Sequence, residues 1–228
     1  VHLSAQTKYL QKYSYIEDRA RVQSGSYPNY KYGFVDKEGN EVIAVKYDGA
    51  EDFSNGFARV SLNKKFGIID KQGNEVIPVK YSFIKRFSEG LAEVAIGGEW
   101  VEYNDFPINA EWGYINTKGE LIVPFKYDIT TPFKNGVAIV KGGGNNSKYG
   151  LINSKGEELT PLKYDGLDFF EEGTNIAKVM INDKQGFINN QGQEIVPPNF
   201  DYLFCSDSMI LVRSSDKSGF YNLKGQEV

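Results

Sequence analysis

Residues 65–81 read KFGIIDKQGNEVIPVKY, and this stretch returns in altered form along most of the chain. Each copy carries two glycines that lie six residues apart. The first glycines of the copies are Gly33, Gly67, Gly113, Gly150, Gly186 and Gly219, and the second ones are Gly39, Gly73, Gly119, Gly156, Gly192 and Gly225. Successive first glycines are 34, 46, 37, 36 and 33 residues apart. A recurring period of this size is the sequence signature of a repeat protein, so the chain is predicted to be an array of about six units.

Each unit is predicted to contain three short antiparallel strands. In the second unit, a first strand ends at Val60, a second covers 65–70 and a third covers 75–81. An Asp-x-x-Gly or Asn-x-x-Gly turn joins the last two strands in every unit. In such a turn the Asp or Asn side chain accepts a bond from a backbone N–H two residues on, and glycine takes the left-handed position.

The third strand carries a proline in four units, Pro78, Pro124, Pro161 and Pro197. Proline has no N–H to donate to a neighbouring strand. The third strand is therefore predicted to begin as a hairpin arm and then to leave the sheet. The first glycine of each unit lies between bulky residues inside a strand, which indicates a close approach of backbone or of a ring. The neighbouring aromatic ring is expected to pack over the glycine.

These motifs resemble the WG (KWG) β-repeat family. The second unit, residues 65–94, follows the family pattern nearly throughout, although the name-giving tryptophan occurs in this position once, as Trp112. The resemblance covers about residues 19–228. It implies a bacterial, all-β repeat protein, and it brings no catalytic residues.

The predicted fold class is all-β, a tandem repeat of about six three-stranded antiparallel units in an open solenoid or superhelical stack. A closed, propeller-like ring is the alternative, because the chain ends could complete each other. Residues 1–18 are interpreted as an N-terminal cap or the tail of a preceding repeat. Residues 19–228 form the repeat domain, with an inserted loop at 97–107.

The composition excludes several kinds of function. The net charge is −4, which disfavours nonspecific nucleic-acid binding. No apolar run reaches the roughly 20 residues of a membrane helix. The one cysteine, Cys205, and the one histidine, His2, make disulfides, Ser-His-Asp or Cys-His triads and histidine metal sites improbable, so we expect no cofactor and no metal. The compartment stays open, with an exported or periplasmic location favoured.

The inserted loop holds the candidate site. The spacing of 46 residues between the second and third units exceeds 34 by 12, and the extra residues are acidic and aromatic. Inserted loops on repeat scaffolds often carry binding. The aromatic residues of this inserted loop could anchor a protein or stack on a sugar, or they could pack inward over the sheet edge. The candidate residues are Trp100, Tyr103, Phe106, Glu99 and Glu102.

Other features have simpler structural explanations. Residues 142–148, GGGNNSK, lack the spacing of a phosphate-binding loop and suit a flexible hairpin turn. A recurring lysine before the aromatic of the third strand and a recurring glutamate after the second glycine would form ladders on stacked units. A lysine ladder could meet an anionic polymer, whereas edge protection and solubility are the simpler role.

Together these features predict a non-catalytic binding or scaffold domain that holds a protein partner. A carbohydrate-binding module that uses exposed aromatics of the 97–107 loop is the alternative. A glycoside hydrolase with a carboxylate pair among Glu99, Glu102 and Asp105 is a third hypothesis.

Overall fold

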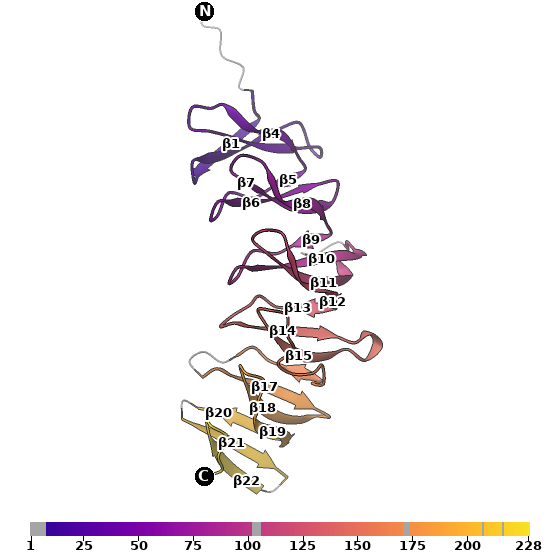
Figure 1. The fold of residues 1–228 in the computed structure, drawn as a ribbon, viewed down its shortest axis with the longest axis vertical. Coiled ribbons are helices and arrows are strands. Elements are labelled where there is room, and N and C mark those ends of the chain that lie inside the picture. The colour runs from indigo at the N-terminus through magenta and orange to yellow at the C-terminus, as the bar shows by residue number, and fades with distance from the viewer. Residues whose placement is uncertain (1–7, 102–105, 171–173, 207, 216) are drawn as a thin grey trace, which may run out of the picture. The chain divides into compact units, whose positions relative to one another are not determined.

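The computed structural model describes residues 8–101, 106–170, 174–206, 208–215 and 217–228 (Figure 1). Its contacts divide the chain into two compact units. Unit 1 comprises Val1–Arg86, Val94–Ala110 and Ile115–Glu120, and unit 2 comprises Phe87–Glu93, Glu111–Tyr114 and Leu121–Val228.

Six small antiparallel sheets follow one another along the chain, and none closes on itself. The first is β1 (Gln11–Ile16), β2 (Arg19–Ser24), β3 (Lys31–Val35) and β4 (Glu41–Tyr47). The second is β5 (Gly49–Ala50), β6 (Phe57–Leu62), β7 (Lys65–Asp70) and β8 (Glu75–Tyr81). The third is β9 (Phe83–Ile84), β10 (Leu91–Glu99), β11 (Ile108–Asn116) and β12 (Leu121–Tyr127). The fourth is β13 (Ile129–Thr130), β14 (Val137–Gly142) and β15 (Lys148–Asn153). The fifth is β16 (Gly166–Leu167), β17 (Ile176–Ile181), β18 (Lys184–Asn189) and β19 (Glu194–Phe200). The sixth is β20 (Tyr202–Cys205), β21 (Met209–Ser214) and β22 (Lys217–Asn222).

The prediction of an all-β tandem repeat is confirmed. Besides strands, the described residues contain one short 3-10 helix, Gly144–Asn146, in the hairpin predicted for the GGGNNSK stretch. A search of the described helices for a span long and apolar enough to cross a membrane found none. The number of strands per sheet differs from the prediction, because β5, β9, β13 and β16 add a two-residue strand to their sheets. Two residues are too few to produce a periodic pattern that sequence reasoning can detect.

The turn chemistry is as predicted. In the second repeat, Asp70 Oδ1 accepts hydrogen bonds from the backbone N–H groups of Gln72 and Asn74, each at 2.9 Å. Gly73 has φ +86°, the left-handed conformation that glycine adopts without strain. The Asn turns repeat this geometry, for example at Asn189, whose Oδ1 accepts from Gln191 and Gln193. Asp and Asn are thus interchangeable here, because both supply the side-chain oxygen that accepts these hydrogen bonds.

The proline strand stays in the sheet, so the prediction that it leaves was wrong. Phe66 pairs with Tyr81 and Ile68 pairs with Ile77. An advance of two residues along β7 therefore corresponds to an advance of four residues along β8, which is a bulge in β8. Pro78 lies inside this bulge and is exposed. A bulge leaves residues unpaired, which removes the cost of a missing N–H.

The bulge explains the first glycine of each repeat. A Cβ on Gly67 would lie 2.7 Å from the carbonyl oxygen of Ile77, and a Cβ on Gly186 would lie 2.5 Å from that of Val196. The neighbour that excludes a side chain at both positions is therefore backbone, rather than the aromatic ring expected from the sequence. In the last repeat, a Cβ on Gly219 would meet Val212 Cγ2 at 3.4 Å, an ordinary contact.

The fourth sheet lacks a regular outer strand for a local reason. Thr160 stands where the second repeat has Ile77, and its hydroxyl accepts a hydrogen bond from Leu151 N–H at 2.9 Å. The third strand is reduced to isolated bridges, such as Ile152 with Glu158. A side-chain hydroxyl has replaced part of the ladder between strands.

Each repeat buries its aromatic and aliphatic residues against the next repeat within the same unit. In unit 1, Phe34, Ile43 and Tyr47 of the first sheet share one core with Phe53, Val60 and others of the second. Phe34 and Phe53 meet edge to face, with ring centroids 4.8 Å apart. The same pair recurs in unit 2 as Tyr114 and Phe133 at 4.9 Å. Packing of each repeat on its neighbour is the contact pattern of a solenoid.

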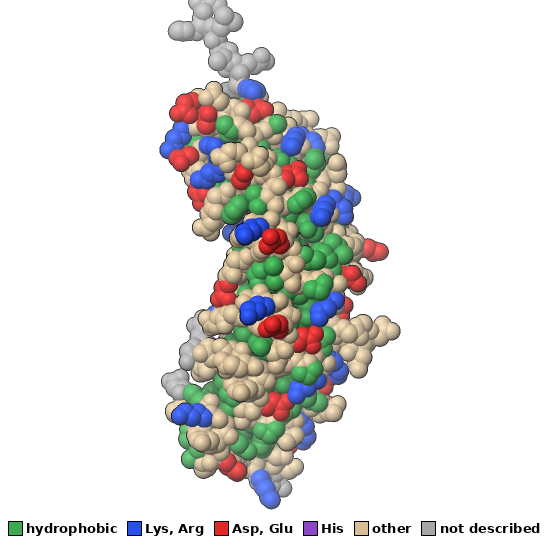
Figure 2. All heavy atoms as spheres, viewed as in Figure 1, with side chains coloured by type: hydrophobic (Ala, Val, Ile, Leu, Met, Phe, Trp, Pro, Cys, Tyr) green, Lys and Arg blue, Asp and Glu red, His purple; other side chains and the backbone are tan. Residues whose placement is uncertain are grey.

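Several of the recurring lysines and glutamates form ion pairs between repeats. Lys126 lies 3.1 Å from Glu158 and Lys163 lies 2.7 Å from Glu194, and Lys8 makes the equivalent pair with Glu41 at 3.0 Å. Figure 2 shows basic and acidic side chains interspersed on the face in view. These lysines are therefore committed to inter-repeat ion pairs, which fits the structural explanation better than recognition of an anionic polymer.

Glutamates also clip the turn of one repeat to the turn of the next. The Glu17 carboxylate accepts from the N–H groups of Asn55 and Gly56 at 2.6 and 2.8 Å. Glu89 does the same for Asn135 and Gly136 at 2.7 and 2.9 Å. Charged acceptors strengthen such bonds, so the turns are fixed as well as the strands.

The close backbone approach predicts different outcomes for two glycine substitutions in unit 2. Gly186→Ala should lower the free energy of unfolding by about 1–3 kcal/mol, because its Cβ has to displace the Val196 carbonyl. Gly219→Ala should change it by less than about 1 kcal/mol, because its Cβ would make an ordinary contact with Val212 Cγ2. Urea titration of both variants checks this, and equal destabilisation would contradict the account of the bulge.

Candidate functional site

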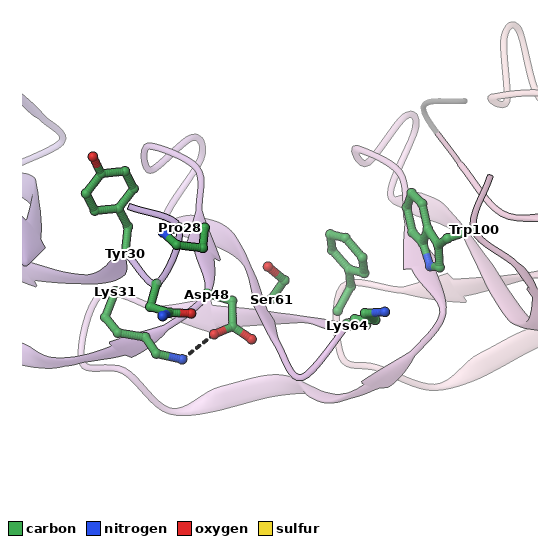
Figure 3. Close-up of a pocket in the computed structure, with 9 residues that line it drawn as sticks. Pro28, Tyr30, Lys31, Asp48, Ser61, Lys64 and Trp100 are labelled. Carbon is green, nitrogen blue, oxygen red and sulfur yellow. Dashed lines mark hydrogen bonds and ion pairs between the residues drawn. The ribbon is translucent and has the colours of Figure 1, made fainter. Parts of the chain in front are cut away.

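A groove in unit 1 runs past the hairpin tips of successive repeats (Figure 3). It encloses about 540 Å³ and combines aromatic with polar side chains. Figure 3 shows Tyr30 and Trp100 far apart along it, with Lys31, Asp48, Ser61 and Lys64 between them. The full lining is Pro28, Asn29, Tyr30, Lys31, Asp48, Ser61, Lys64, Phe66 and Trp100.

Loops between paired strands place these side chains. The β2–β3 connection supplies Pro28 and Tyr30, and it contains a cis peptide bond between Tyr27 and Pro28. The tight β6–β7 tip supplies Lys64, where Asn63 and Lys64 have φ of 51° and 60°. Two consecutive residues with positive φ match the turn that suits the twist of a short hairpin. Trp100 follows directly after β10.

Trp100 packs on one side and is open on the other. Its ring stacks on Phe66, with centroids 5.8 Å apart and planes at 27°, and it meets the edge of Phe83 at 5.7 Å. The residue is nevertheless 42% exposed. The ring is therefore held in place by the second and third repeats while part of its surface remains available to a ligand.

An ion pair crosses the middle of the groove. The Lys31 ammonium donates to one oxygen of Asp48, and the N–H of Asn63 donates to the other at 2.6 Å. The Lys31 side chain, followed by the Asn63 N–H, holds the pKa of Asp48 below its usual range, although partial desolvation acts in the opposite direction. Asp48 thereby ties the middle strand of one repeat to the hairpin tip of the next.

Sequence reasoning missed this aspartate. The arrangement recurs where Asp165 binds Lys148 and Asn182 N–H, and where Asp201 binds Lys184 and Ser215 N–H. The available signal was an Asp directly after the aromatic of the third strand together with a Lys two residues before the first glycine. The recurrence assigns Asp48 a structural role, so it is not by itself a mark of a ligand site.

The other candidates from the sequence have different surroundings. Glu99 is exposed at the end of β10. Phe106 is 47% exposed, and the Lys85 ammonium lies 5.5 Å from its ring centroid. Of the predicted residues, Trp100 lines the groove and Phe106 and Glu99 do not. Tyr103 and Glu102, with Asp105 of the carboxylate hypothesis, lie outside the described residues.

The other candidate binding features of the described residues are smaller or have a structural explanation. Unit 2 has a small cleft of about 130 Å³ beside the exposed Phe169. Cys205 packs at the margin of a hydrophobic cluster, as expected for an apolar filler. No group of three or more His, Cys, Asp or Glu side chains with metal-binding geometry occurs among the described residues.

The sequence profile of the WG containing repeat matches residues 32–66, 66–100, 112–145, 149–184 and 186–217. The chain belongs to this family. The resemblance seen in the sequence is thus confirmed, and the matched WG repeats cover most of the chain. Membership is consistent with a non-catalytic repeat scaffold. No curated protein matches the chain.

Solved structures match the chain at very low sequence identity and low TM-score. Hsv2p of Kluyveromyces lactis is 11% identical with a TM-score of 0.39, over 90% of this chain and 76% of that one. The AfRom2 CNH domain is 10% identical with a TM-score of 0.32, over 96% and 83%. A chain of the nidogen/laminin complex is 9% identical with a TM-score of 0.33, over 92% and 89%.

The Asp48 ion pair predicts a pH-dependent difference between wild type and Asp48→Asn. A carboxyl group with a depressed pKa stabilises the fold fully above its unfolded pKa of about 3.9. That stability is lost as the pH falls through the lower folded pKa. Wild type should therefore have the higher Tm at pH 7, and the difference should vanish near pH 2.

Asp183→Asn provides the baseline, because it removes an exposed carboxylate that has no ion-pair partner among the described side chains. Thermal melts followed by circular dichroism from pH 7 to pH 2 measure both differences. A Tm difference for Asp48→Asn that is independent of pH would contradict a role for its charge.

Proposed function

We propose that this WG-repeat chain is a non-catalytic binding and scaffold module that holds a protein partner on the hairpin edge of unit 1. The single observation that supports this most strongly is the exposure of large aromatic side chains along that edge. Tyr27, Trp100 and Phe106 are 82, 42 and 47% exposed, and they come from the connections of two different repeats.

Exposed aromatic residues of this size are where the energy of protein interfaces concentrates. Trp and Tyr bury a large area on binding and lose little conformational freedom. Scattered apolar residues are normal on any surface, but Trp100 lines a groove, and Trp100 and Phe106 belong to the inserted loop. These exposed aromatic side chains could form the apolar centre of an interface, and the polar side chains of the groove lie close to Trp100.

The edge is also held rigidly, which lowers the entropic cost of binding. The Asp48 carboxylate fixes the β6–β7 tip through Asn63 N–H. Arg59 spans two repeats, since it donates to the Ile84 carbonyl oxygen at 2.6 Å and its guanidinium lies 4.8 Å from the Phe83 ring centroid. Phe83 and Phe66 then support Trp100. The binding residues are thus carried on a framework of packed strands.

The proposal predicts that partner capture depends on Trp100. Immobilised wild type should retain a protein from the native organism, and Trp100→Ala should retain at least about tenfold less, equivalent to about 1.4 kcal/mol. Phe169→Ala is the matched control, because it removes an exposed ring from unit 2 that is 74% accessible. Capture quantified by mass spectrometry checks this.

Loss of capture by both variants, or by neither, would count against the hairpin edge as the binding site. A clean absence of any retained protein, with circular dichroism showing an intact fold, would count against the protein-binding function itself.

Carbohydrate binding is the second candidate, and the surroundings of Trp100 favour it. A sugar can place its C–H face on a Trp ring while its hydroxyl groups bind polar side chains, and Asn29, Ser61 and Lys64 line the same groove. This candidate predicts a glycan-array signal for wild type that Trp100→Ala abolishes and Phe169→Ala keeps. A silent array, or a signal unaffected by Trp100→Ala, would contradict it.

The glycoside hydrolase hypothesis gains no comparable support. Such enzymes need two carboxyl groups facing each other across the substrate. Among the described residues that line the groove, Asp48 is the one carboxylate, and it is bound by Lys31.

A further inference from the structure

The second repeat departs from a charge pattern that three other repeats share. In the first, fourth and fifth repeats, the lysine that opens the middle strand is neutralised by the aspartate described above, as Lys31–Asp48, Lys148–Asp165 and Lys184–Asp201. In the second repeat, Lys65 holds the lysine position and Ser82 stands in place of the aspartate. Lys65 is exposed, and its ammonium group makes no ion pair with a described residue.

The adjacent hairpin tip carries a second departure. The second residue of the tight tip is Asp18 in the first sheet and Asp183 in the fifth, both with positive φ. In the second sheet that residue is Lys64. Its side chain is exposed and lines the groove, and like Lys65 it forms no ion pair within the described part of the chain.

These two changes leave positive charge uncompensated in one place. The charge of Lys31 is cancelled by Asp48, while Lys64 lines the groove without a partner carboxylate. The exposed Lys65 follows Lys64 in the sequence and directly precedes Phe66, on which Trp100 stacks. The chain as a whole is acidic, with a net charge of −4. The charged side chains that line the groove, Lys31, Asp48 and Lys64, thus carry a net positive charge, opposite in sign to that of the whole chain.

From this charge pattern we infer that the groove selects an acidic peptide segment of the partner. A carboxylate of that segment binds Lys64 and Lys65, and an apolar or aromatic side chain packs on the open part of Trp100. The inference rests on the proposed protein-binding function and narrows it to a class of partner.

An extended peptide suits this arrangement for a geometric reason. Residues two positions apart in an extended strand lie on the same face, so an acidic residue at i and an aromatic residue at i+2 can both be directed at the groove. Nucleic acid is a poorer fit, because a polyanion needs several compensating cations and the acidic chain repels it. A peptide that carries one carboxylate near one aromatic side chain requires only the two neighbouring lysines and the Trp100 ring.

Fluorescence anisotropy of labelled peptides tests the inference. The probe is the peptide Ac-GEGFGEGFG-amide, in which Glu and Phe share one face of the extended strand, and its matched versions carry Gln for every Glu, Lys for every Glu, or Ser for every Phe. The protein variants are the double charge reversal Lys64→Glu with Lys65→Glu, and the control Lys118→Glu with Lys155→Glu. The control makes the same charge change at exposed turn residues away from the groove.

Wild type should bind the acidic probe at least about tenfold more tightly than the Gln version. The groove reversal should remove that preference and should favour the Lys version instead, whereas the control should keep the wild-type order. Raising the salt from about 0.1 M to about 1 M, which shortens the screening length from roughly 10 Å to roughly 3 Å, should abolish most of the preference. The Ser version should bind weakly to every form, as should the acidic probe to Trp100→Ala.

Equal binding of the Glu and Gln peptides, or an unchanged preference in the groove reversal, would overturn the inference. If the Gln peptide binds as well as the Glu peptide and this binding still depends on Trp100, the proposed protein-binding function stands and the preference for an acidic partner is disproved. Binding of no peptide at all also overturns the inference, and the capture experiment with Trp100→Ala then decides separately whether the wider function survives. Circular dichroism of each variant shows that the strands are intact.

Discussion

The close approach of a backbone carbonyl to a glycine is the contact on which the regular repeats depend. A side chain at Gly67 or Gly186 would collide with the strand that follows, so these positions admit no other residue without rearrangement. The approach is possible because the outer strand bulges, and the bulge in turn removes the N–H requirement that would exclude proline. One geometric constraint therefore explains the glycine, the proline and the strand register together. It also brings the buried tyrosine at the end of the outer strand, such as Tyr81 opposite Phe66, back into the sheet.

The repeat fold could be predicted from the sequence because its signals are local and occur in several copies. The Asp70-type turns and the paired strands follow from short-range hydrogen bonding, and six copies make the pattern unambiguous. What the sequence could not show were contacts between residues about 32 positions apart, such as Lys126 with Glu158. It also gave no sign of short strands such as Gly49–Ala50, or that Pro78 stays within its strand.

The candidate site was predictable in part for the same reason. Trp100 stands out because it lies in the longest departure from the repeat length, and the structure places it in the groove. Tyr30 and Lys64 belong to ordinary connections, and their sequence gives no sign that three successive hairpins lie along one edge. The functional importance of Lys65 is even less apparent in the sequence. It becomes visible once Asp48 is known to neutralise Lys31, because Ser82 can then be recognised as a missing partner.

The ion pairs between repeats have a consequence for how such a chain can grow. Each repeat that keeps both residues carries a lysine for the following repeat and a glutamate for the preceding one, as Lys163 and Glu158 show within the fourth repeat. A duplicated repeat would therefore already contain the lysine and the glutamate needed to pair with the repeats on either side, and it could be inserted without changes in those repeats. Gene duplication could lengthen the array one module at a time, while single modules, like the second repeat here, are free to acquire a distinct surface.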